Sequence, residues 1–216
     1  MHAGPAVACA LALAASGCAR LGSADHAGLD RPLRILDAAS VDAVGRSDCA
    51  PAPGAAAGSA WLAPQTALLS AALAGLGPDV DAGEAARVAD AALRTALTLR
   101  RRYGVAGPPR MHNLLVNLGV KDKGLCFDWT HDLMEQLRAL APRTLDLYWG
   151  MANPWDALRQ HSSVVVTAHG RPFSSGLVLD GWRAGGCLYW VPVTADSYPW
   201  EEAIRYPVPA AHVPGG

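Results

Sequence analysis

The stretch that most constrains the fold is residues 121–140, KDKGLCFDWTHDLMEQLRAL. Cys126 opens a segment in which Trp129, Leu133 and Leu137 recur at the spacing of one face of a helix. The thiol is therefore expected on the first helical turn. Unpaired backbone N–H groups and the positive end of the helix dipole favour a thiolate at that position.

Local charge acts in the same direction. Lys121 and Lys123, the only lysines in the chain, come directly before the helix. A cationic neighbour lowers the pKa of a thiol, because it stabilises the charged form. Cys126 is therefore the candidate nucleophile, although a packed, inert thiol on this apolar helix face is the alternative.

Two later segments, each with the pattern of a strand, contain a candidate base and a candidate orienting acid for such a nucleophile. His161 begins the β-branched run HSSVVVTA, and Asp180 ends the run GLVLD. The residues between them contain Gly, Pro and Ser, which predicts a hairpin with its tip near Arg171. His161 and Asp180 are then expected at the same open end of adjacent antiparallel strands. If the helix of Cys126 packs on that sheet, a Cys-His-Asp triad results.

The order of these three elements resembles that of the bacterial transglutaminase-like cysteine peptidases, within the papain-like superfamily. The segment GLCFDWTHDL is similar to their G-x-C-x-x-W nucleophile motif, HSSVVVTA to their histidine strand and LVLDGW to their aspartate strand. The likeness covers roughly residues 111–200. It implies an α+β fold with a helical N-terminal part, in which the nucleophile helix packs on a small antiparallel sheet. It also implies thiol acyl-transfer chemistry.

The expected mechanism uses all three residues. Cys126 attacks an amide or ester carbonyl, His161 takes and returns protons, and Asp180 holds the imidazole in its useful tautomer. The acyl-enzyme then reacts with water in a hydrolase or with an amine in a cross-linking enzyme. The residue types do not choose between these outcomes, and no metal or organic cofactor is implied.

Supporting roles fall on residues near the expected triad. The backbone N–H of Cys126 and the side chain of Asn117 are candidates for an oxyanion hole, with Asn113 as the other asparagine in that short helix. Trp129 and Trp182 are candidates for the wall of a substrate cleft, and Trp182 is expected closest to the triad. Burial in the core is the alternative for these tryptophans.

The N-terminal region has the composition of an export signal. Residues 1–17 are small and apolar and predict a signal peptide, and the ending A-S-G-C resembles a bacterial lipobox in which Cys18 is lipidated. Ala19 then favours the outer membrane, facing the periplasm, by resemblance to bacterial sorting patterns. The alternative is an apolar N-terminus that is merely rich in alanine. Residues 18–60 are expected to form a flexible tether, 61–206 the domain and 207–216 a Pro-rich tail.

The remaining elements follow from apolar periodicity and breaker residues. The predicted helices span residues 65–76, 82–103 and 110–118, and further predicted strands span residues 144–153 and 188–193. The sheet is expected to have three or four antiparallel strands.

Charge and residue clustering limit the partners. The net charge is −1, so no basic surface argues for nucleic acid. Asp128, His131 and Asp132 crowd on one helix without a matching Cys or His cluster, so a zinc site is not expected. The expected partners are a peptide or protein amide substrate, including a cell-wall peptide, and the membrane through the lipid anchor.

The disulfide pairing of the cysteines distinguishes two hypotheses about the function. In an exported chain, a bond between Cys49 and Cys187 would leave Cys126 free, whereas a bond between Cys126 and Cys187 remains open from the sequence. A free, reactive Cys126 would favour an envelope-anchored thiol hydrolase or acyltransferase. A disulfide-bonded Cys126 would favour a non-catalytic envelope lipoprotein that uses the same fold as a binding or scaffolding module.

Overall fold

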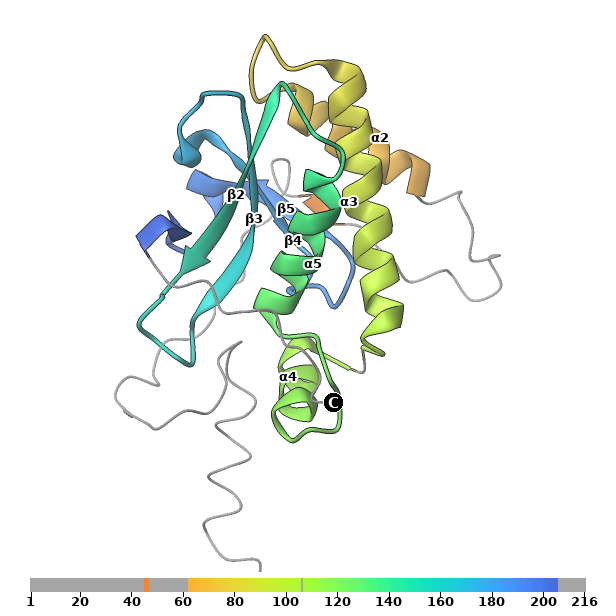
Figure 1. Ribbon diagram of the computed structural model, residues 1–216, viewed down its shortest axis with the longest axis vertical. Coiled ribbons are helices and arrows are strands. Elements are labelled where there is room, and N and C mark those ends of the chain that lie inside the picture. The colour runs from red at the N-terminus through yellow and green to blue at the C-terminus, as the bar shows by residue number, and fades with distance from the viewer. Residues whose placement is uncertain (1–44, 47–61, 106, 206–216) are drawn as a thin grey trace, which may run out of the picture.

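The computed structural model describes residues 45–46, 62–105 and 107–205 (Figure 1). The proposed signal peptide, Cys18 and the tail of residues 207–216 lie outside the described residues, as does most of the proposed tether. The helices are α2 (Leu62–Ala74), α3 (Ala82–Arg102), α4 (Pro109–Asn117) and α5 (Cys126–Arg138). Among the described residues, none of these helices combines the length and the apolar composition needed to span a membrane.

The rest of the described chain forms an antiparallel sheet with short 3-10 turns. Its six strands have the order β1-β5-β4-β3-β2-β6. The strands are β1 (Gly45–Arg46), β2 (Leu145–Ala152), β3 (His161–Ala168), β4 (Leu177–Asp180), β5 (Tyr189–Pro192) and β6 (Trp200–Glu202). The central strand β3 pairs with β2 on one side and β4 on the other, which places it in the middle of the layer.

Helix α5 lies between the sheet and α3, and α2 packs on α3 (Figure 1). Val164 and Val166 of β3 join the larger core with α2, α3 and α5, whereas Val165 faces a second apolar cluster on the other side of the sheet. All eight residues of β3 are buried, because both faces of this strand are covered. This explains why its sequence is a continuous β-branched run rather than an alternating one.

A buried carboxylate joins the start of α3 to the start of β2. The Asp81 side chain caps the helix by accepting the Glu84 N–H at 2.6 Å. The Glu84 side chain does not complete a reciprocal capping box but accepts the Arg143 and Thr144 N–H groups, each at 2.8 Å, and the Thr144 hydroxyl. Glu84 therefore fixes the helical layer to the sheet at the end of the fold away from Cys126.

The α+β class and the packing of the Cys126 helix on an antiparallel sheet are confirmed. The expectation of three or four strands is wrong, because β1 and β6 extend both edges of the sheet. Neither strand has a pattern that sequence reasoning could use. β6 is the three-residue stretch WEE, and β1 has two residues within the stretch expected to be a tether. Their pairing depends on the neighbouring strands rather than on local sequence.

Candidate active site

The nucleophile candidate occupies the first residue of α5. Cys126 is 2% exposed and packs in an apolar cluster with Trp129 and Trp182. Asp128 closes the start of the helix, because its Oδ2 accepts the Gly124 N–H at 2.9 Å and the Leu125 N–H at 3.0 Å. Burial raises the pKa of Asp128, and these backbone N–H groups and Lys123 oppose the rise only in part.

Hydrogen bonds attach the first turn of α5 to the start of β3. The Ser162 hydroxyl lies 3.5 Å from the Cys126 sulfur. The Thr130 hydroxyl donates to the Cys126 carbonyl at 2.8 Å and lies 3.3 Å from the Ser162 hydroxyl. These contacts hold the sulfur beside the residue that directly follows His161.

The base and acid candidates are in contact. His161 Nε2 lies 2.6 Å from Asp180 Oδ2, and each residue is 1% exposed. A hydrogen bond at one ring nitrogen determines the tautomer, so Asp180 places a proton on Nε2, between the two residues. This is the arrangement that an orienting acid requires.

Asp180 is surrounded by donors. Its Oδ1 accepts the N–H groups of Trp182 and Arg183, both at 2.9 Å, and its Oδ2 also lies 3.1 Å from Arg183 Nε. Burial alone would raise the pKa of this carboxyl. The attraction of the protonated His161 ring and of the Arg183 cation, together with their hydrogen bonds, overcomes that effect and holds the pKa of Asp180 well below its ordinary value. Asp180 therefore remains a carboxylate.

Three aromatic rings surround the His161 imidazole. The ring centroids of Trp182, Tyr198 and Trp200 lie 4.8, 4.9 and 5.4 Å from that of His161. Together with the burial of His161, they place the hydrogen bond to Asp180 in a largely water-free environment, where electrostatic interactions are stronger than in water.

The sulfur of Cys126 is oxidised in this structure. Cys126 and Cys187 are both disulfide-bonded. Cys49, which the sequence offers as a partner for Cys187, lies outside the described residues. In this state Cys126 cannot act as a nucleophile, because the thiolate is the reactive form.

The two asparagines of α4 have different surroundings. Asn113 is fully buried, and its Oδ1 accepts the Trp182 indole N–H at 2.9 Å. Asn117, the proposed oxyanion donor, is the last residue of α4 and is partly exposed. The structure therefore brings Asn113, rather than Asn117, against the ring that covers His161.

The two proposed cleft tryptophans also differ. Trp182 contacts His161, as expected. Trp129 is 3% exposed, donates its indole N–H to the Gly124 carbonyl at 3.1 Å and packs edge-on against Tyr103. Trp129 therefore belongs to the core beneath the start of α5, which was the alternative from the sequence.

Several site residues escaped sequence reasoning. Arg183, Asp196 and Tyr198 were not singled out, although Arg183 contacts Asp180 directly and Tyr198 contacts His161. For Arg183 a signal existed, because it follows Asp180 by three residues across a glycine turn. Asp196 and Tyr198 lie more than fifteen residues beyond Asp180, and only the folding of the chain brings them to the site.

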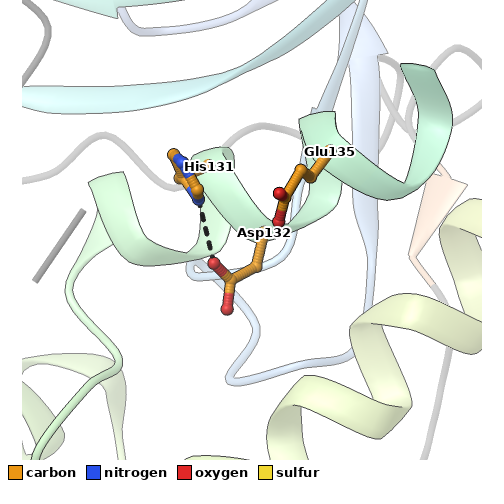
Figure 2. A group of neighbouring side chains, drawn as sticks. All are labelled: His131, Asp132 and Glu135. Carbon is orange, nitrogen blue, oxygen red and sulfur yellow. Dashed lines mark hydrogen bonds and ion pairs between the residues drawn. The ribbon is translucent and has the colours of Figure 1, made fainter. Parts of the chain in front are cut away.

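A separate polar cluster lies on the other side of α5. His131, Asp132 and Glu135 carry potential ligand atoms within 4.8 Å of one another (Figure 2). The cluster borders a cleft of about 400 Å³ between α3 and α5, whose lining does not include the His161 and Asp180 pair. Asp132 already lies 3.2 Å from Lys123 Nζ and 3.0 Å from His131 Nδ1. The Asp132 carboxylate is therefore already engaged by an ammonium group and an imidazole, and we interpret this pair of contacts as a salt-bridge network.

No protein-family model, curated protein or solved structure matches this chain.

Proposed function

We propose that the protein is an envelope-anchored thiol hydrolase or acyltransferase that acts on amide bonds of peptides or proteins. In this proposal the chain is lipidated at Cys18 and faces the periplasm from the outer membrane, and its domain belongs to the transglutaminase-like cysteine peptidases. Cys126 is the nucleophile, His161 the general base and acid, and Asp180 the orienting acid.

The single observation that carries the proposal is the buried hydrogen bond between His161 and Asp180. Cys126 is linked to the same strand end through Ser162, the residue after His161, whose hydroxyl lies 3.5 Å from the Cys126 sulfur. An imidazole oriented by a carboxylate next to a cysteine at a helix N-terminus is the arrangement that activates thiols in acyl transfer.

The proposed reaction begins from the reduced protein. A dithiol reductant donates two electrons and two protons to the disulfide of Cys126, and the dithiol itself becomes a disulfide. His161 then accepts the thiol proton, the thiolate attacks the carbonyl carbon, and the Cys126 N–H supports the oxyanion. His161 returns the proton to the leaving amine. Water or a second amine finally cleaves the thioester and regenerates the thiol.

A second function is favoured by one specific observation. Cys126 is disulfide-bonded and buried, as expected for a structural cystine. In that case the protein is a non-catalytic envelope lipoprotein, and the His161 and Asp180 pair stabilises a binding or scaffolding module.

Alkylation after reduction separates the two functions. The purified full chain is treated with dithiothreitol, desalted and exposed to iodoacetamide at neutral pH, and labelling of Cys126 is followed by mass spectrometry. The catalytic proposal predicts rapid labelling that slows at least tenfold in His161→Ala. His169→Ala is the matched control, because His169 is an exposed histidine on the β3–β4 hairpin. It should label like the wild type.

Activity is then tested on the reduced enzyme. Cell-wall peptides and protein amides are offered with and without an added primary amine, and Cys126→Ala is the control. Turnover that Cys126→Ala lacks supports the proposal, and amine incorporation identifies transfer rather than hydrolysis. A Cys126 that stays unlabelled in a folded, reduced protein without turnover would instead support the binding module.

A further inference from the structure

We propose that Arg183, held by Asp196, is a positioning residue that keeps the Asp180 side chain aligned with His161. The inference rests on the proposed function for its catalytic meaning, but its geometry can be tested without any turnover. Arg183 is not expected to touch a substrate, because its guanidinium is occupied by other side chains.

The guanidinium of Arg183 bridges two buried carboxylates. Its Nε lies 3.1 Å from Asp180 Oδ2, and Nη1 and Nη2 lie 3.0 and 2.8 Å from the two oxygens of Asp196. The side chains of Asp180 and Asp196 are 1% and 0% exposed. A planar fork with fixed donor directions can satisfy both carboxylates at once, which an ammonium group cannot do.

Two tyrosine rings fix the guanidinium itself. Arg183 Cζ lies 4.3 Å from the ring centroid of Tyr189 and 4.8 Å from that of Tyr198. Burial would lower the pKa of Arg183, but the two aspartates raise it above its ordinary value, so the cation persists. The Arg183 guanidinium is therefore permanently charged and held in one orientation.

Asp196 connects this charge to the aromatic rings around the imidazole. Its Oδ2 accepts the Trp200 indole N–H at 2.8 Å, and the Trp200 ring contacts His161. The pair formed by Arg183 and Asp196 thus reaches His161 by three routes, through Asp180 at Nε2 and through the rings of Trp200 and Tyr198. Loss of the pair should weaken all three contacts.

The charge of Arg183 also affects the pKa of Asp180. It is one of the contributions that lower the pKa of Asp180, so its removal must move that pKa upward. Asp180 would then become protonated at a higher pH than in the wild type. The hydrogen bond to His161 would weaken over the same range, because its charged acceptor is lost.

Nuclear magnetic resonance tests this in the full chain as purified. A short hydrogen bond to a carboxylate strongly deshields its proton, so the His161 Nε2 proton should appear far downfield, and a His161→Gln sample assigns it. We expect Arg183→Gln to weaken this resonance. We also expect the resonance to disappear on acidification at a pH about one unit higher than in the wild type, a tenfold change in proton affinity. Arg183→Lys should recover part of the effect, and Asp196→Asn should show a smaller loss. Arg171→Gln, an exposed arginine in the hairpin loop, is the matched control and should behave like the wild type.

The outcomes separate this inference from the proposed function. A folded Arg183→Gln protein with the wild-type resonance and the wild-type acid transition overturns the inference, whatever the enzyme does. If Arg183→Gln does not fold, the same comparison in Asp196→Asn decides the question. Conversely, absence of thiol reactivity in the reduced wild type removes the catalytic role of the site but leaves the resonance test intact.

Discussion

His161 and Asp180 are bonded diagonally rather than directly across the ladder between β3 and β4. The pairing of Val164 with Leu179 continues to place Ser163 opposite Asp180, two residues from His161 on the same strand. Side chains two residues apart lie on the same face of a sheet, and diagonal neighbours are within reach of long side chains. The hairpin thus brings the imidazole and the carboxylate together at its open end.

This relationship makes Asp180→Asn an informative change. The amide keeps the size of the side chain but removes the charge that orients and stabilises the imidazole. If the reduced protein is catalytic, we expect its amide turnover to fall about 10³-fold or more, by comparison with similar substitutions in other triads. Steady-state kinetics of the reduced protein measure the loss. Asp146→Asn, which removes a carboxylate bonded to the exposed His169, is the control and should retain activity. Equal rates for Asp180→Asn and the wild type would contradict the triad.

The oxyanion donor can be assigned by comparing two asparagines on one helix. Asn113 is buried against Trp182, whereas Asn117 is partly exposed at the end of α4. If the reduced protein is catalytic as proposed, we expect Asn113→Ala to lower its turnover by about 10²-fold, the order seen when one oxyanion or positioning contact is lost. Asn117→Ala should have little effect. The reverse ranking would restore Asn117 as the donor.

Glycine is required at the turn that precedes Cys126. Gly124 has a φ of +129°, and an added Cβ would overlap the His112 ring. We expect Gly124→Ala to lower the free energy of unfolding by about 3 kcal/mol or more, because backbone strain and overlap combine.

Gly119 provides the matched control for that change. Its φ is +71°, but nothing lies within 4 Å of an added Cβ. Gly119→Ala should therefore cost only about 1–2 kcal/mol of backbone strain. Chemical denaturation of the wild type and both variants measures the loss in the free energy of unfolding. Equal losses in the two variants would contradict a role for the overlap with His112.

The Glu84 carboxylate predicts an acid dependence of stability. Burial raises its pKa, but hydrogen bonds from Arg143 and Thr144 outweigh this, so the pKa of Glu84 is lowered below the value in the unfolded chain. Its stabilising contribution is therefore complete above the unfolded pKa and is lost as the pH falls through the folded one.

A neutral replacement should remove that dependence. At pH 7 we expect Glu84→Gln to lower the free energy of unfolding by about 1–3 kcal/mol, since hydrogen bonds to a charged acceptor are lost. The difference from the wild type should shrink as the pH drops below about 4. Urea denaturation across this pH range provides the measurement. Glu135→Gln, at an exposed site on α5, should show no comparable loss.

Regular elements with strong local patterns could be predicted from the sequence. The start of α5 at Cys126 and the full extent of β3 from His161 were predicted at the residues where they occur. The pairing of His161 with Asp180 also followed from the hairpin, because few residues separate the two strands. The short strand β6 was missed, since its single buried tryptophan carries no periodic signal.

The sequence by itself determined which residues could supply a nucleophile, a base and an acid, because helix starts and hairpins depend on neighbouring residues. Only the tertiary structure decided what surrounds them. Asp196 meets Arg183, and Trp200 meets His161, because the chain crosses to the β2 edge of the sheet after β5. The oxidation of Cys126 likewise depends on which parts of the chain the fold brings together. Such contacts join residues far apart in sequence, and no local pattern encodes them.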